Sequence, residues 1–115
     1  MATNREKNLG DANSAIDRIH TQIRAIDLLC QGTLLKRTKV CGKPNCRCAQ
    51  DPSARHGPYH EWNRRLEGRL VHSLVSAEQA RLLHRAIRNY RVVLRLLARW
   101  SRETAKIIGV KNELK

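Results

Sequence analysis

Three cysteines lie within eight residues, in the segment CGKPNCRC that runs from Cys41 to Cys48. Glycine and proline disfavour a helix there, so the backbone is expected to curl into a loop. Thiolates held this close repel one another unless a divalent cation lies between them, and zinc accepts such ligands in tetrahedral structural sites. The spacing therefore predicts a bound Zn2+, with Cys41, Cys46 and Cys48 as three of its four ligands.

The fourth ligand is sought among the residues that follow, in the run HGPYH. His56 is the first choice, because the irregular loop before it allows the chain to turn back toward the cysteines. His60 is the second choice, and Cys30, upstream in a predicted helix, is the third. A redox pair of Cys46 and Cys48, or simple thiols, is the alternative to a metal.

A catalytic zinc would need an open coordination position and a neighbouring general base. Glu61 is the acid next to the predicted histidine ligands. The His-x-Glu and Pro-Cys-x-x-Cys pattern of zinc deaminases is absent from the sequence. We therefore predict a binding protein, not an enzyme, with no small-molecule substrate.

A second group of residues suited to binding lies near the C-terminus, where eight cations follow one another at steps of three or four. They are Arg81, Arg85, Arg88, Arg91, Arg95, Arg99, Arg102 and Lys106. At about 100° per helical residue they fall within about one third of the helix circumference. Between the first and the last of them the only acid is Glu103. The spacing therefore predicts one cationic side of a helix.

A solvated helix face usually mixes acids with bases, because opposite charges four residues apart attract while like charges repel. Seven of the eight cations are arginines, whose planar guanidinium can contact two phosphate oxygens at once. The pattern predicts a nucleic-acid surface, for DNA more than RNA, which Arg64 and Arg65 would extend. A solvated face and an acidic protein partner are the alternatives. Phosphate contacts position a protein without reading bases, so no sequence specificity is predicted.

The charge distribution supports a polyanionic partner. The formal net charge is +13, yet residues 1–30 carry four cations and four anions. Residues 31–75 carry nine cations against three anions, and residues 76–115 carry ten against three. The N-terminus lacks the apolar segment of a signal peptide, and no apolar run approaches the roughly 20 residues that span a bilayer. We expect a cytoplasmic protein without a membrane partner, in which the cysteines are thiols or metal ligands.

An N-terminal helix is predicted for residues 13–31, preceded by a flexible arm at residues 1–10. Asp11 or Asn13 is expected to cap its start, and Gly32 is expected at its C-terminal end. Apolar residues at three- and four-residue spacings form one stripe of this helix. They are Ile16, Ile19, Ile23, Ile26 and Cys30.

The middle of the chain, residues 33–75, reads as a small antiparallel element of three strands. Its strands are expected at Thr33–Val40, Tyr59–Leu66 and Arg69–Val75. Glu67 and Gly68 between the last two predict a β-hairpin with a tight turn. The cysteine loop then connects the first two strands, so the predicted metal would stabilise this element.

A long basic helix is predicted for residues 76–108, followed by a polar tail at 109–115. Ser76 and Gln79 have the spacing of a capping box. The apolar arc of this helix is wider than one partner helix would cover, so we expect it to meet the first helix and then the β element or a second copy in a homodimer. The arc comprises Ala80, Leu82, Leu83, Ile87, Tyr90, Val93, Leu94, Leu96, Leu97, Trp100 and Ile108. The expected fold is α+β, with residues 1–115 as a single domain.

The run GTLLKRxxxCGKPNCRCA, followed by HGPY, resembles the signature of a family of small uncharacterised prokaryotic proteins. The resemblance covers roughly residues 32–100. It implies a cysteine-rich turn, a short hairpin and a long C-terminal helix, often among mobile-element genes, and implies Cys41, Cys46, Cys48 and His56 as the metal set. It implies no activity. A regulator or accessory of a mobile element is the function expected, and an adaptor that docks a larger enzyme through its apolar helix face is the alternative.

Overall fold

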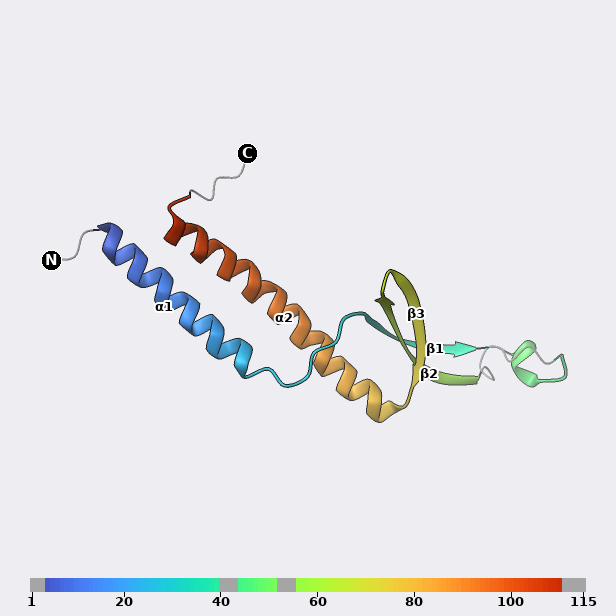
Figure 1. Cartoon of the computed structure of the whole chain (residues 1–115). Helices are drawn as coiled ribbons and strands as arrows, with labels where there is room; N and C mark the ends of the chain where they lie inside the picture. Colours follow the sequence, from blue (N-terminus) through green and yellow to red (C-terminus); the bar gives the residue numbers. More distant parts are fainter. Residues whose placement is uncertain (1–3, 40–43, 52–55, 111–115) are drawn as a thin grey trace. The chain divides into compact units, whose positions relative to one another are not determined.

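The computed structural model describes residues 4–39, 44–51 and 56–110 (Figure 1). It confirms the α+β fold class, with two helices and one three-stranded antiparallel sheet. The chain divides into two compact units. We call one the helical unit, made of the residues up to Asp27 and those from Arg88 onward, and the other the sheet unit, Leu28–Ile87. In chain order the elements are α1 (Asn4–Arg24), β1 (Thr33–Lys39), η1 (Arg47–Ala49), β2 (His56–Leu66), β3 (Arg69–Val75) and α2 (Ala77–Ile108).

In the helical unit, α1 runs antiparallel to the C-terminal part of α2 (Figure 1). The His20 and Trp100 rings meet edge to face with centroids 4.6 Å apart. Toward the start of α1, Arg5 and Leu9 line one hollow together with Ile108 from the end of α2. Apolar burial stabilises the pair, since Ala12 and Ile19 of α1 and Leu96 of α2 are all buried.

The first helix lies earlier in the chain than predicted. It begins at Asn4, so the expected flexible arm is wrong for residues 4–10, because Leu9 and Ala12 extend the inward stripe toward the N-terminus. Asn13 is therefore inside the helix, where its side-chain amide donates to the carbonyl oxygen of Leu9 at 3.0 Å. The helix ends at Arg24, not near residue 31.

Gly32 does not end a helix, as predicted, but lies directly before β1. Its φ of +114° is a conformation that favours glycine. A Cβ atom there would collide with the carbonyl oxygen of Asn63 and would lie 2.7 Å from Nε1 of Trp62. The glycine is needed because the chain passes this close to β2.

The sheet is three-stranded and antiparallel, as predicted, and its order is β1-β2-β3, with β2 in the centre. Trp62 of β2 faces Leu34 of β1 and Ser73 of β3 across the two ladders. β2 begins at His56, three residues before its predicted start. The tight turn is confirmed, because Glu67 (φ 51°) and Gly68 (φ 81°) both adopt positive φ, as a type I′ hairpin requires.

The first turns of α2 pack against one face of the sheet within the sheet unit. Trp62 and Val75 line a hollow with Leu82 and Leu83 of α2, and Ala80 is 5% exposed. The predicted capping box is confirmed at the helix start. The Ser76 N–H donates to Oε1 of Gln79 at 2.8 Å, and the Gln79 N–H donates to Oγ of Ser76 at 3.0 Å. Two otherwise unpaired backbone donors are thereby satisfied.

Candidate nucleic-acid interface and metal loop

All eight predicted cations of α2 are exposed to solvent. Six of them, from Arg88 to Lys106, belong to the helical unit, and Arg81 and Arg85 belong to the sheet unit. The side chain of Leu96, on the part of the helix turned toward α1, is only 4% exposed. The eight cations therefore lie in solvent, whereas Leu96 on the same helix is buried.

Four arginines form the core of this surface, which we call the arginine row: Arg88, Arg91, Arg95 and Arg99. With the residues that the structure describes, none of the four makes a hydrogen bond or an ion pair. The row runs from Arg88 to Arg99, twelve residues in all, or about 16 Å along the helix axis. Its guanidinium groups are available for contacts with another molecule.

The remaining cations of α2 differ from the row, since some of them have intramolecular partners. Nζ of Lys106 lies 3.0 Å from Oε1 of Glu103, one turn earlier. Arg85 and Arg102 also take part in interactions within the chain. Glu103, the one acid in the sequence between Arg81 and Lys106, therefore pairs with the last of these cations.

Arg64 and Arg65 do not form one continuous surface. The Arg64 guanidinium stacks 3.8 Å from the centroid of the Trp62 ring and donates to Oγ of Ser73 at 3.0 Å. Arg65 is exposed and donates to the carbonyl oxygen of Gly68 at 3.4 Å. Because neighbouring residues of a strand point to opposite faces of a sheet, a single phosphate backbone lying on one face would meet only one of these arginines.

The apolar arc of α2 is only partly covered in the helical unit. Leu96 is buried and Trp100 is half-buried against α1. Leu94 and Leu97, two members of the predicted arc, are 48% and 46% exposed, and Ile108 is 70% exposed. The first helix therefore packs on one edge of the arc, and an apolar strip stays open to solvent.

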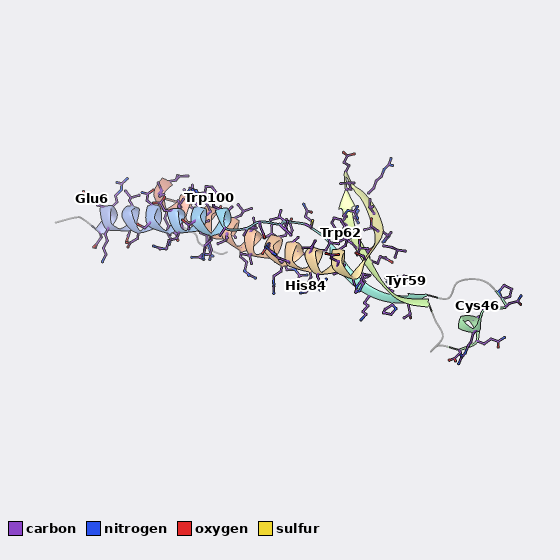
Figure 2. All side chains as sticks on the ribbon, turned by 90° about the horizontal axis from the view of Figure 1, so that it is seen from below. Glu6, Cys46, Tyr59, Trp62, His84 and Trp100 are labelled. Atoms are coloured by element: carbon purple, nitrogen blue, oxygen red, sulfur yellow. The ribbon has the colours of Figure 1, made fainter. Side chains whose placement is uncertain are left out.

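The structure describes part of the cysteine loop. Cys46 is half-buried and directly precedes η1, where its carbonyl oxygen accepts a hydrogen bond from the Ala49 N–H at 3.1 Å (Figure 2). Arg47 forms an ion pair with Asp51 at 3.4 Å. A short helical turn thus brings the backbone of Cys46 and Cys48 close together, which suits two sulfur ligands of one ion.

Most of the predicted metal set lies outside the described residues. This holds for Cys41 and for the side chains of Cys48 and His56. In the described part of the chain, no three Cys, His, Asp or Glu side chains gather in a way that would hold a metal.

The backbone nevertheless separates the three candidates for the fourth ligand. His56 pairs with Lys39 across the β1–β2 ladder, where both strands meet the cysteine loop. His60 lies four residues further along β2, about 13 Å from that end. Cys30 lies beyond the opposite end of β1, where its N–H donates to the carbonyl oxygen of Ala86 at 3.2 Å. In the strand register, His56 is the candidate that lies at the ends of β1 and β2 joined by the loop.

One polar cluster on the sheet was missed by the sequence analysis. Glu61 is only 7% exposed, and its Oε1 lies 3.3 Å from Nδ1 of His72, which is also hydrogen-bonded to Oδ1 of Asn63. Strand alternation places Glu61 and Asn63 on the same face, but only the β2–β3 register brings His72 opposite Asn63. No sequence motif signals such a pairing.

Comparison with protein families matches residues 10–84 to a family described as "Domain of unknown function (DUF6788)". The chain belongs to this family. The matched region includes most of α1, the whole sheet and the start of α2, so it begins and ends earlier than the resemblance carried by the cysteine motif. It ends at His84, and the entire arginine row lies outside it. Comparisons with curated proteins and with solved structures found no match.

Neither α1 nor α2, over the residues described, contains a segment that combines the length and the apolar character needed to cross a bilayer.

Proposed function

We propose that the protein binds nucleic acid, DNA in preference to RNA, through the cationic side of α2. The observation that carries this proposal is the arginine row, four exposed guanidinium groups on one side of a helix with no acid among them. Like charges in a row lack the stabilisation that pairs of opposite charge give to a helix. A polyanionic partner that supplies the opposite charge would explain such a row.

Guanidinium groups suit phosphate because their donors lie in one plane and can contact two oxygens at once. Each phosphate that the row neutralises releases condensed counterions from the nucleic acid, so affinity falls as salt rises. Contacts by all four arginines of the row predict a slope of about −3.6 for log K against log salt with duplex DNA. Such contacts fix position without reading sequence.

The test is a salt titration of binding to duplex DNA and to RNA of the same sequence, measured side by side by fluorescence anisotropy. The double variant Arg88→Glu with Arg95→Glu should abolish binding, because it reverses two of the four charges. Both side chains are exposed, so the variant should keep the circular dichroism spectrum of the wild type.

A matched control is the double variant Arg5→Glu with Arg18→Glu on α1, which changes the net charge by the same amount on exposed residues of the same unit. It should bind DNA with an affinity within a few-fold of the wild type. If the two variants lost binding equally, net charge and not the row would be responsible. If the wild type bound neither polymer at low salt, the proposed function would be wrong.

We propose further that the cysteine loop holds one structural Zn2+ through Cys41, Cys46, Cys48 and His56. The thiolate-rich donor set suits zinc, and the pairing of Lys39 with His56 closes the base of the loop. A closed set of four protein ligands leaves no position for a substrate, in keeping with a binding protein and not an enzyme. Metal analysis of the purified protein should return about one zinc per chain.

The proposed setting is the cytoplasm, where thiols stay reduced. There the protein would serve as a regulator or accessory of a mobile element.

A second candidate function rests on the open apolar strip formed by Leu94, Leu97 and Ile108. Exposed apolar strips of this kind mark protein interfaces, so the chain would act as an adaptor or form a homodimer. The double variant Leu94→Glu with Leu97→Glu should then shift the mass measured by light scattering to that of a monomer, or abolish binding of a partner enzyme. A wild type that is monomeric at all concentrations would exclude the homodimer.

A further inference from the structure

A hollow of about 540 Å³ lies between the start of α2 and the sheet, within the sheet unit. Two residues of the sheet and four of α2 line it: Leu34, His60, Ala77, Ala80, Arg81 and His84. Figure 2 shows His84 on α2. The hollow lies outside the arginine row and uses no residue of the predicted metal set.

The hollow exists because α2 has small residues at this place. Ala77 and Ala80, one turn apart, are the small side chains of the helix that line it beside Leu34 and His60. On the other side of the same helix–sheet contact, Leu82 and Leu83 meet Trp62 and Val75. Alanine does not fill the space that leucine would fill, and a recess with an apolar floor results.

The rim of the recess has a different character from its floor. His60 from β2 and His84 from α2 contribute imidazole rings, and the exposed Arg81 contributes a guanidinium. Among the residues that the structure describes, no acidic side chain lines the recess. An apolar floor, two flat rings and a cation suit a planar ring that is linked to a negatively charged group.

We propose that this recess takes an unpaired nucleobase whose adjacent phosphate is held by Arg81. The inference rests on the proposed function, since it assigns a contact to the bases of the bound polymer in addition to its phosphates. Bases inside a duplex are stacked and paired, and therefore cannot enter a recess of this kind. A base in a single strand is accessible and stacks on aromatic or imidazole rings.

The test compares two single strands with the same phosphates, one a run of roughly a dozen thymidines and the other an abasic strand of equal length. The wild type should bind the thymidine strand at least about tenfold more tightly, because base stacking contributes only when bases are present. The variant Ala77→Leu fills the recess, so it should bind both strands with equal affinity. Its affinity for duplex DNA should be unchanged.

The control is Ala98→Leu, which adds the same bulk at an exposed position of α2 outside the recess. It should keep the tenfold preference. Ala77 is itself exposed, so Ala77→Leu should fold, and circular dichroism checks this. His84→Ala tests the recess without adding bulk and should reduce the preference several-fold.

The outcomes separate this inference from the proposed function. Equal binding of thymidine and abasic strands by the wild type, with normal salt-dependent binding of duplex DNA, would show that the recess binds no base. The proposed role of the arginine row would not be affected by that result. An unchanged preference in both Ala77→Leu and His84→Ala would also overturn the inference. Absence of binding to every nucleic acid would overturn both.

Discussion

The arginine row and the cysteine loop represent two ways in which a short chain can build a binding site. The row consists of exposed side chains at helical spacing on α2, and each would act on the proposed partner through its own charge. The loop joins β1 to β2 beyond the pair formed by Lys39 and His56, and its proposed ligands would be held together by an ion. The affinity of the row for its partner should therefore fall gradually as charges are removed or screened. Loss of the ion from the loop should instead unfold the sheet unit cooperatively.

Removal of the metal should have the largest effect. Chelation, or the variant Cys46→Ser, should destabilise the sheet unit by several kcal/mol, because zinc binding contributes folding free energy directly. Thermal unfolding followed by circular dichroism measures the loss. DNA binding by the arginine row should persist at temperatures below the new transition.

The control for this prediction is Cys30→Ser, since Cys30 lies at the opposite end of β1 from the loop. It should leave the zinc content unchanged. Equal loss of zinc in both variants, or unchanged stability after complete removal of zinc, would contradict the proposed structural role of zinc.

The next largest effect is expected at Gly32. Gly32→Ala should destabilise the protein by about 3 kcal/mol, because the new methyl group would meet the carbonyl of Asn63 and the indole of Trp62 at a strained φ. Gly10→Ala is the control, since nothing lies within 4 Å of its Cβ position and the residue is helical. That change should stabilise the protein by roughly 0.5–1 kcal/mol. Urea unfolding compares the two, and opposite signs are expected.

The elements that are determined by a few neighbouring residues could be predicted from the sequence. The capping box at Ser76 and Gln79 gave the start of α2 to within one residue, and the Glu67-Gly68 pair gave the hairpin. The cationic side of α2 follows from spacing alone. Each of these depends on a few neighbouring residues and not on distant contacts.

The features that depend on distant contacts could not be predicted. Gly32 has a positive φ, but the reason is its approach to Asn63, 31 residues later, and not the helix end that was expected. The contact between Glu61 and His72 depends on the register of β2 and β3. Leu94 belongs to the arc that was expected to be covered, but α1 packs on one edge of that arc, and amphipathic spacing alone does not say which part a partner covers.

A smaller effect is expected from the start of α2. Ser76→Ala removes the hydroxyl that accepts the Gln79 N–H and should cost about 1 kcal/mol in unfolding free energy. Because Ser76 lies in the sheet unit, the affinity of the arginine row for DNA should stay the same. Ser14→Ala, at an exposed position inside α1, should change stability by a few tenths of a kcal/mol at most. A parallel loss of DNA affinity in Ser76→Ala would show that the two regions are not as independent as proposed.

The smallest effect is predicted for a substitution at Glu103, where the direction of the change in DNA affinity is what tests the proposal. Glu103→Gln removes the only acid among the cations of α2 and releases Lys106 from its 3.0 Å contact. An exposed ion pair of this kind stabilises a helix by a few tenths of a kcal/mol, so stability should barely change. DNA affinity at low salt should rise by a factor of about two to five, and the salt slope should steepen by up to about 0.9.

Asp17→Asn removes one negative charge from an exposed position on α1 and should leave the slope unchanged, because Asp17 is on the other helix of the same unit. An unchanged slope in Glu103→Gln would mean that the bound polymer does not reach the last turn of α2, and that the contact is confined to the arginine row.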